Sequence, residues 1–219
     1  IALGSVIRNL LYPDFFLIGS SSKSKIPLKL KKYFTSNLKI KKEQIYNMNY
    51  VNAEITKLSL NTYITTKITF ANTIASLCEN IKEADSEVIC DAIGADKRVG
   101  KSYLRGSIPY GGPCFPRDNN ALSFFAKKNK LKSDLPKTVH NINENRVNDI
   151  YLYIKKLKPK NNLISVVGLS YKENTDVIDE SFGIKIANLL SKKGFKVSVY
   201  DKNLKFYSIK KEKILNSKI

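Results

Sequence analysis

Histidine, cysteine and tryptophan are scarce in this sequence, and each shortage excludes a class of protein. The 219 residues include one histidine, three cysteines and no tryptophan. No sequence neighbour would orient His140 as the base of a catalytic triad, so we interpret it as structural. Three scattered cysteines, an odd number, do not form a disulfide framework. We therefore expect a protein of a reducing cytoplasm, and we predict no metal site.

Long apolar runs are also missing. No run is long enough to cross a bilayer, although 42% of the residues are hydrophobic, which suffices for one medium domain or two small ones. The first residues, Ile1-Ala2-Leu3-Gly4-Ser5, lack the charged-then-apolar order of a signal peptide. These features predict a cytoplasmic protein without a membrane partner.

Acidic residues are outnumbered two to one. Against 38 lysines and arginines stand 19 aspartates and glutamates, which gives a net charge of +19. Such a charge is typical of nucleic-acid-binding proteins. However, the lysines are spread along the chain, aromatic stacking motifs are missing, and the joint abundance of Asn, Ile and Lys indicates an AT-rich coding bias. We favour the bias over a nucleic-acid partner, because a basic surface attracts any anionic ligand.

The most informative segment is a loop that places a cysteine directly before a predicted helix. Gly111 and Gly112 permit backbone angles that other residues avoid, and they permit a ligand to come close. Pro113 and Pro116 stiffen both sides of Cys114. The positive end of the following helix and the neighbouring Arg117 favour the thiolate, the nucleophilic form of cysteine. A small apolar cysteine in a tight turn is the alternative, and on local chemistry alone the two interpretations are evenly matched.

The same loop carries a family resemblance. Residues 110–118 read Tyr-Gly-Gly-Pro-Cys-Phe-Pro-Arg-Asp, which closely resembles the catalytic-cysteine motif of the UDP-glucose/GDP-mannose dehydrogenase family. Members of that family oxidise the primary alcohol of a nucleotide sugar to the acid in two steps, with two NAD molecules. The resemblance implies that Cys114 is the nucleophile. It also implies that Lys57 and Asn61, four residues apart in a predicted helix, stabilise an oxyanion, and that Asp118 and Lys57 handle protons and water.

The resemblance further implies a set of binding residues. Arginines suit this task because the planar guanidinium matches phosphate oxygens, and in the family the arginine at the place of Arg98 reaches substrate across a dimer interface. Arg117 is the candidate contact for the cofactor NAD. The candidate contacts for a UDP-sugar substrate are Arg98, Tyr103, Arg105, Tyr110, Gly111, Gly112, Tyr171 and Lys172.

Periodicity predicts the supporting elements. A short helix near residues 6–11 precedes predicted strands at 15–18 and 45–48, with a basic helix at 28–34 between them. Residues 51–81 form an apolar stripe at helical spacing without proline or glycine, which predicts a helix longer than one small domain. Residues 82–105 predict two short helices, and 118–157 are predicted as helical.

The C-terminal part predicts a Rossmann-like unit with a strand at 163–168, a helix at 181–193 and a strand at 196–201. This unit lacks Gly-x-Gly-x-x-Gly, so it is a weak dinucleotide site. Its sequence resembles the family's UDP-binding domain instead. Asp179 stands where many members have an arginine, and Leu3 stands where the family usually has a glutamate.

Together these patterns predict an α/β fold with a long central helix. We expect the end of an N-terminal Rossmann-type, NAD-binding domain at 1–50 and an all-helical dimerisation and catalytic-cysteine domain at 51–158. The start of a Rossmann-like UDP-binding domain is expected at 159–219. The chain is thus interpreted as an internal fragment of a homodimeric nucleotide-sugar 6-dehydrogenase, inactive by itself.

Three alternatives stay open. The substrate could be a UDP-N-acetylhexosamine or GDP-mannose rather than UDP-glucose, since the family uses one frame for all. The chain could be a non-catalytic, dimerising nucleotide-binding remnant, which the departure at Leu3 favours and the retention of Cys114 and Asp118 opposes. A basic nucleic-acid-binding protein is the third hypothesis, and strongly salt-dependent DNA binding would support it.

Overall fold

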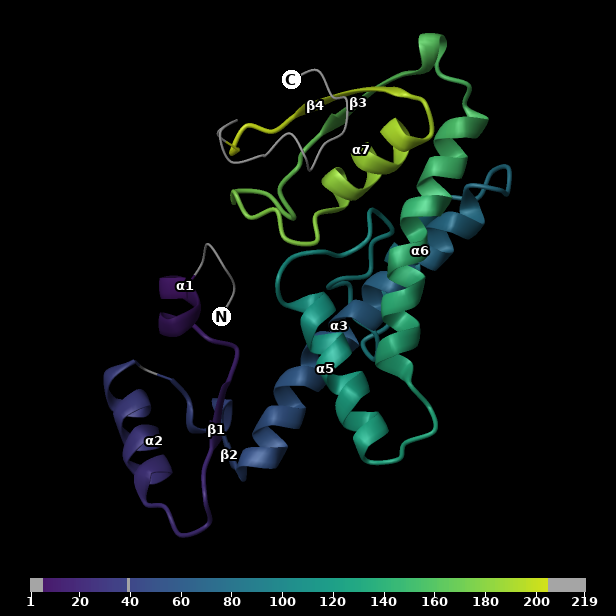
Figure 1. Cartoon of the computed structure of the whole chain (residues 1–219). Coiled ribbons are helices and arrows are strands. Elements are labelled where there is room, and N and C mark those ends of the chain that lie inside the picture. The colour runs from purple at the N-terminus through teal and green to yellow at the C-terminus, as the bar shows by residue number, and fades with distance from the viewer. Residues whose placement is uncertain (1–5, 39, 205–219) are drawn as a thin grey trace. The chain divides into compact units, whose positions relative to one another are not determined.

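The computed structural model describes residues 6–38 and 40–204, and it divides into two units, residues 1–60 and 61–219, which we treat separately (Figure 1). The predicted α/β class is confirmed: helices accompany two-stranded parallel sheets, and the uninterrupted helix α3 (Tyr50–Cys78) is 29 residues long. Leu3 and the C-terminal end of the predicted UDP-binding domain lie outside the described residues. Among the described helices, none combines the length and apolar character needed to cross a membrane.

In the first unit, a crossover helix joins two parallel strands, as a parallel pair requires. Phe16 pairs with Ile45 and Gly19 with Met48, so the predicted strands and the helix between them are confirmed. The phenyl rings of Phe16 and Phe34 stack at 4.5 Å, which packs the helix against the sheet. The elements of this unit before α3 are α1 (Val6–Leu11), β1 (Phe16–Gly19), α2 (Ile26–Asn37), a 3-10 turn (Lys42–Gln44) and β2 (Ile45–Met48).

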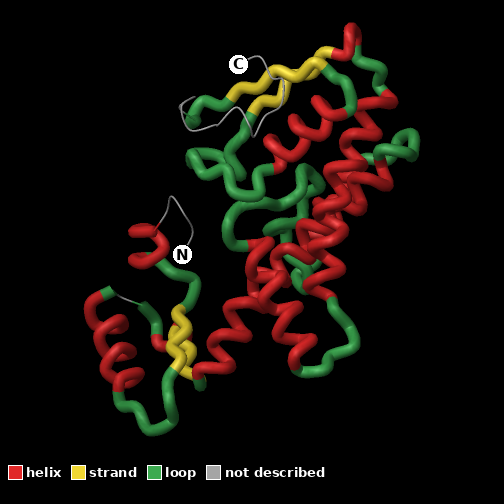
Figure 2. Tube along the Cα trace, in the orientation of Figure 1, coloured by secondary structure: helices red, strands yellow, loops and turns green. Residues whose placement is uncertain are grey.

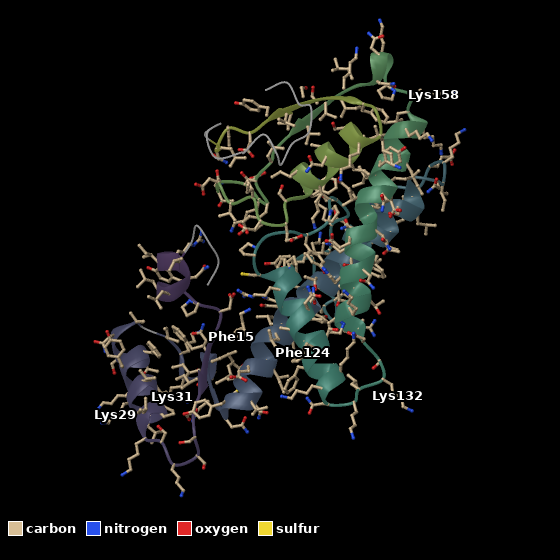
Figure 3. The ribbon with its side chains drawn as sticks, in the orientation of Figure 1. Phe15, Lys29, Lys31, Phe124, Lys132 and Lys158 are labelled. Carbon is tan, nitrogen blue, oxygen red and sulfur yellow. The ribbon has the colours of Figure 1, made fainter. Side chains whose placement is uncertain are left out.

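Helix α2 has a proline in its first turn and carries exposed lysines, among them Lys29 and Lys32. Pro27 lies in the first turn, where a missing N–H costs nothing. Lys29, labelled in Figure 3, is exposed on this helix, as expected for a solvated basic face.

The second unit contains most of α3, and the buried side of α3 is small and polar rather than apolar. Thr62, Thr65, Thr69 and Asn72 are buried, whereas Leu77, which the apolar stripe placed on the inner face, is 56% exposed. The reason is tertiary: Thr62 and Thr65 hydrogen-bond to Asn119 of the helix after the cysteine loop, and Asn72 hydrogen-bonds to Ser107 and Ile108.

A single capped helix follows α3. Helix α4 (Ser86–Ala95) begins at the N-cap Asp85, whose carboxylate accepts the amides of Glu87 and Val88. The second short helix expected before residue 105 is absent: residues 97–103 form turns, in which Gly100 and Tyr103 have φ values of +72° and +61°. Backbone angles of this kind interrupt a right-handed helix.

Two helices, α5 and α6, follow the cysteine loop, and the chain then enters the second sheet. Helix α5 (Phe115–Lys128) packs along α6 (Leu135–Lys156), which begins at the N-cap Asp134. Strands β3 (Leu163–Val167) and β4 (Lys196–Tyr200) pair in parallel around α7 (Phe182–Lys192), so the predicted Rossmann-like order is confirmed (Figure 2).

The core of the second sheet extends onto α6. Its buried side chains come from the loop after β3, from α7, β4 and the segment after β4, and one of them, Val147, belongs to α6. The sheet unit therefore packs directly on the helices that carry the cysteine loop. The buried members of this cluster are Val147, Leu169, Ile186, Ala187, Leu190, Val197, Val199 and Leu204.

Gly183 in α7 and Gly194 just after this helix allow a test of this packing. A Cβ on Gly183 would lie 2.1 Å from the carbonyl oxygen of Gly168, whereas Gly194 has open space but a φ of +86°. We expect Gly183→Ala to lose about 2 kcal/mol of unfolding free energy through overpacking, and Gly194→Ala about 1 kcal/mol through left-handed strain. Urea unfolding measures both. An equal or smaller loss for Gly183→Ala would contradict the close approach of α7 to β3.

Candidate active site around Cys114

Cys114 is the N-cap residue of α5 and is exposed, with a free thiol. Its side chain makes no capping hydrogen bond, while its carbonyl oxygen accepts the amide of Asp118 at 2.8 Å. Pro116 lies in the first turn, where the missing N–H of proline costs no hydrogen bond. The sulfur is therefore accessible and stands at the positive end of a 14-residue helix.

One turn into α5, Asp118 forms the polar centre of the site. Its residue is 3% exposed, and its two carboxylate oxygens take different partners. Asn61 Nδ2 donates to Oδ2 at 2.6 Å, and Arg117 donates to Oδ1 from Nε at 3.0 Å, with its NH2 group 2.9 Å away. This places predicted residues from two helices in one network.

Arg117 connects that network to the cysteine. The pKa of Arg117 is raised, mainly by its hydrogen bond and charge pairing with Asp118 and to a smaller degree by Cys114. Its side chain is 66% exposed, so the guanidinium can also meet a ligand. Lys57 lies on the part of α3 that belongs to the other unit, and its role beside Cys114 stays a prediction.

Gly111 and Gly112 serve a purpose that the sequence did not indicate. We expected them to admit a ligand, but the protein itself comes close. A Cβ on Gly111 would lie 2.2 Å from the carbonyl oxygen of Glu180, and one on Gly112, where φ is +82°, would lie 2.4 Å from the Tyr171 ring. Gly112 N–H also donates to the carbonyl oxygen of Asp179 at 2.9 Å. The two glycines therefore let the segment after β3 close on the cysteine loop.

Tyr110 is buried, and its contact with substrate stays a prediction. It is 7% exposed, and its hydroxyl accepts Asn119 Nδ2 at 3.0 Å. Burial raises the pKa of this phenol. The Asn143 amide pairs with the Tyr110 backbone, and the ring of His140 lies 6.4 Å from the Tyr110 ring. The side chain of Tyr110 and its backbone thus hold the cysteine loop against α5 and α6.

Asn119 and Asn143 are the residues that the sequence reasoning missed. Both lie in helix interiors, at 0% and 1% exposure. Asparagine is unfavourable there because its amide competes with the helix for backbone hydrogen bonds. An asparagine at a position where a predicted helix should be buried was the signal that could have identified these two residues.

Arg98, Tyr103 and Arg105 lie in the segment between α4 and α5 and are exposed. Arg98 pairs with Asp96, whose oxygen is 2.6 Å away, and Arg105 Nε donates to Glu87 at 3.0 Å. Both pairings raise the pKa of the arginine concerned.

The next residue, Gly106, packs on Ala75, which is about 20 Å along the helix axis from Asn61. Arg105 therefore stands apart from the Cys114–Asp118 network of the same chain.

Tyr171 and Lys172 stand beside the loop. The ring of Tyr171 contacts Gly112, and the ammonium of Lys172 lies 5.5 Å from the centre of that ring. Asp179, the departure from the family pattern, contributes its backbone carbonyl to the loop while its side chain is exposed.

The acidic residue at the end of β4 is engaged by the protein. Asp201 Oδ2 accepts the amides of Leu169 and Ser170 at 2.7 and 2.8 Å, and Asn203 N–H binds Oδ1. In a dinucleotide fold this position holds a ribose. Here the carboxylate binds the backbone of the loop after β3 instead, which agrees with the absence of a Gly-x-Gly-x-x-Gly motif from this unit.

A cavity of about 520 Å³ lies elsewhere in this unit, between the end of α3, the start of α4 and α6. Gly106, Ser107 and Ile108 form one wall, and Arg146 with Glu79 forms another. Cys114 does not line it. Within residues 6–38 and 40–204, no three His, Cys, Asp or Glu side chains gather in a way that could hold a metal.

Two family models match the chain. The central domain of the UDP-glucose/GDP-mannose dehydrogenase family matches residues 51–145, and the UDP binding domain of the same family matches residues 165–218. The chain belongs to this family. The membership predicted from residues 110–118 is confirmed, because the central-domain match contains that motif and the second match contains most of the β3–α7–β4 unit.

Individual relatives agree. A UDP-glucose 6-dehydrogenase of Rickettsia bellii is 35% identical over 203 residues, which are 90% of this chain and 46% of the relative. A UDP-glucose 6-dehydrogenase of Bacillus subtilis is 36% identical over 161 residues, 72% of this chain and 36% of that protein. The chain therefore spans less than half the length of these relatives.

Solved structures share the fold. A UDP-glucose dehydrogenase from the hyperthermophilic archaeon Pyrobaculum islandicum superposes with a TM-score of 0.80 at 28% identity, covering 91% of this chain and 45% of that one. A UDP-D-ManNAc dehydrogenase from Pyrococcus horikoshii gives 0.78 at 24% identity, covering 98% and 50%. The second likeness concerns the fold alone.

The hydrogen bonds to Asp201 predict that the stability of the fold depends on pH. Burial alone would raise the pKa of Asp201, but the backbone and side-chain donors outweigh it and lower the pKa. A lowered pKa stabilises the fold above the unfolded value of about 3.9, and this stabilisation is lost as the pH falls through the folded pKa.

We expect Asp201→Asn to lose about 1–3 kcal/mol at pH 7, with the deficit shrinking below about pH 4. Urea unfolding at several pH values measures the deficit, and Asp149→Asn, at an exposed position of α6, is the control. A deficit that does not depend on pH would contradict the role of the carboxylate.

Proposed function

We propose that this chain carries the catalytic cysteine and the UDP-binding part of an NAD-dependent nucleotide-sugar 6-dehydrogenase, with UDP-glucose as the first candidate substrate. The observation that carries the proposal is the exposed Cys114 at the start of α5, followed one turn later by the buried Asp118, which Asn61 and Arg117 hold. Relatives named UDP-glucose 6-dehydrogenases support this choice of substrate.

A nicotinamide cofactor would supply the oxidising power, with one NAD molecule consumed in each of two successive oxidations of the sugar C6 carbon. Among the described residues, the exposed Arg117 guanidinium is the candidate contact for this cofactor. The β3–α7–β4 unit does not fit a dinucleotide, since its strand-end carboxylate is occupied by Leu169 and Ser170. We therefore propose that the reaction belongs to a protein in which this chain is joined to a nicotinamide-binding domain.

The chemical role of Cys114 follows from its exposure and its position. The first oxidation turns the C6 alcohol into an aldehyde. The Cys114 sulfur then attacks the aldehyde carbon, and the carbonyl oxygen gains a proton, which gives a thiohemiacetal. The second oxidation gives a thioester. Water adds to the thioester carbon, the C–S bond breaks, and the sulfur regains its proton, so that the acid leaves and Cys114 is restored.

Asn61, Asp118 and Lys57 are proposed to act around that carbon. The Asn61 amide donates to Asp118 in the structure, and an amide donor of this kind stabilises an oxyanion when charge develops nearby. Asp118 is proposed to pass the proton of the attacking water, together with Lys57. Arg98 is proposed to reach the substrate bound by a second copy of the chain, and Arg105 is proposed to contact the UDP part.

Two regions are proposed to bind the UDP part. Tyr171 and Lys172 stand beside Gly111 and Gly112, so a nucleotide bound there reaches the cysteine loop directly. The segment from Tyr103 to Tyr110 is the second region. UDP-N-acetylhexosamines and GDP-mannose stay alternative substrates, because the described contacts concern the loop and leave the sugar unspecified.

A variant of the nucleophile tests the reaction. In the protein joined to its nicotinamide-binding domain, we expect Cys114→Ser to reduce the rate of NAD reduction with UDP-glucose by about 1,000-fold or more, because a hydroxyl is a far weaker nucleophile. UDP-glucose affinity, measured by calorimetry, should stay within about twofold.

The control is Cys78→Ser, a half-buried cysteine away from α5. Unchanged turnover by Cys114→Ser would refute the covalent mechanism. The 219-residue chain alone is expected to bind UDP-glucose without reducing NAD. Nucleotide binding together with failure of the joined protein to reduce NAD would favour the non-catalytic remnant.

Exposed apolar side chains along α3 support a homodimer. Tyr63, Phe70 and Leu77 recur every seven residues, so they share one face of the helix, and they are 61%, 45% and 56% exposed. Phe124 of α5, labelled in Figure 3, is another exposed aromatic at 70%. We propose that a second copy of the chain covers the α3 face.

Charge placed on that face should separate the copies. We expect Phe70→Lys to shift the 219-residue chain from dimer to monomer in sedimentation-equilibrium experiments, with at least about a tenfold weaker association. Val88→Lys on α4 is the matched control, since Val88 is also an exposed apolar residue, at 65%, and lies outside α3. A dimer that survives Phe70→Lys unchanged would place the interface elsewhere.

A further inference from the structure

The segment before Cys114 has no regular secondary structure, yet much of it is buried. Residues 104–113 are neither helix nor strand, while Leu104, Tyr110 and Gly112 are buried. Buried backbone N–H and C=O groups need partners. Around Tyr110 those partners are side-chain amides.

Asn143 of α6 pairs with the backbone of Tyr110 at both polar groups. Its Oδ1 accepts the Tyr110 amide at 2.8 Å, and its Nδ2 donates to the Tyr110 carbonyl oxygen at 3.0 Å. One side-chain amide thus satisfies both backbone groups of Tyr110, as a neighbouring strand would in a sheet. At 1% exposure, the amide is beyond the reach of bulk water, so the two bonds fix the peptide planes at residue 110.

Asn119 of α5 holds the other end of the same residue. Its Nδ2 donates to the Tyr110 hydroxyl and to Thr65 Oγ1, both at 3.0 Å. Its Oδ1 accepts the hydroxyl of Thr62 at 2.8 Å. The Tyr110 ring is thereby tied to α3 and α5, and Asn119 follows directly after Asp118.

Between Tyr110 and Cys114 the chain has little freedom left. Gly111 and Gly112 lie against Glu180 and Tyr171, and Gly112 N–H is bonded to the segment after β3. Pro113 fixes its own φ. The position of the cysteine then depends on the anchor at Tyr110 on one side and on α5 on the other.

We propose that Asn119 and Asn143 are positioning residues for the nucleophile: by clamping Tyr110, they hold Cys114 beside Arg117 at the start of α5. The role rests on the proposed function of Cys114, but the clamp can be tested by itself. Both residues act through Tyr110, and neither is proposed to touch substrate.

The test uses two alkylating reagents of opposite character on the 219-residue chain. Iodoacetate is anionic and iodoacetamide is neutral, so the ratio of their rates at Cys114 reports the positive charge beside the sulfur. Altered access or altered thiol ionisation changes both rates together and cancels in the ratio. Peptide mass spectrometry follows Cys114 separately from Cys78 and Cys90.

The Arg117→Gln variant gives the ratio of the iodoacetate rate to the iodoacetamide rate in the absence of the guanidinium. We expect this ratio to be lower than that of the unchanged chain by about twofold or more. Asn143→Ala and Asn119→Ala are expected to fall to the Arg117→Gln ratio, because the unclamped loop lets Cys114 leave Arg117. Tyr110→Phe, which removes only the hydroxyl, covers the case in which an alanine variant fails to fold, and it should give an intermediate ratio.

Asn72→Ala is the matched control. Asn72 is also a buried asparagine that binds the segment twice, at Ser107 and Ile108, but farther from Cys114. Its variant should lose similar stability and keep the original ratio. The proposal is overturned if the Asn143 and Asn119 variants keep the original ratio, or if Asn72→Ala lowers it equally, since the effect would then be general loosening.

The outcomes separate the clamp from the reaction. If Cys114→Ser in the joined protein still turns over while the ratios behave as expected, the clamp stands and the covalent mechanism fails. In the same protein, Asn143→Asp keeps the acceptor and loses the donor. A positioning role predicts a loss in kcat of about tenfold with KM for UDP-glucose within about twofold, whereas equal changes in both would contradict it.

Discussion

The structure depends on how one irregular, partly buried segment satisfies its backbone hydrogen bonds. The chain from Leu104 to Pro113 runs between α3, α5 and α6 without joining a helix or a sheet. Asparagine amides from α3 and α6 supply its partners, and a third asparagine, from α5, holds the Tyr110 hydroxyl. An unpaired buried amide or carbonyl costs about 1–3 kcal/mol, so these side chains are needed for the loop to exist in one conformation.

The same requirement explains the composition of the helix faces around the loop. A purely apolar inner face on α3 would leave the loop without partners, and threonine and asparagine stand there instead. Large apolar residues are displaced to the outer face, where Tyr63 and Phe70 are exposed. Hydrogen bonding to the loop and the exposure of large apolar side chains on α3 are thus two consequences of one arrangement.

The second sheet closes the site from the other side. Its loop after β3 is held by the Asp201 carboxylate, and its segment before α7 contacts Gly111 and Gly112. An ion pair of Lys185 with Glu144, at 2.8 Å, joins α7 to α6 one residue from Asn143. A nucleotide bound beside Tyr171 would therefore act on the same loop that carries the cysteine, which is the physical basis for placing binding and chemistry together.

The sequence alone determined the elements and the family. Helical spacing, prolines and caps act over a few residues, so α3, α6, α7 and all four described strands were predictable, and the motif around Cys114 identified the family. Only the tertiary structure decided the partners: that Gly111 and Gly112 admit Tyr171 and a backbone carbonyl, that Tyr110 is buried, and that Asn119 and Asn143 hold it. Those contacts join residues up to about 70 positions apart, and local pattern carries no information on which distant group fills a space or completes a hydrogen bond.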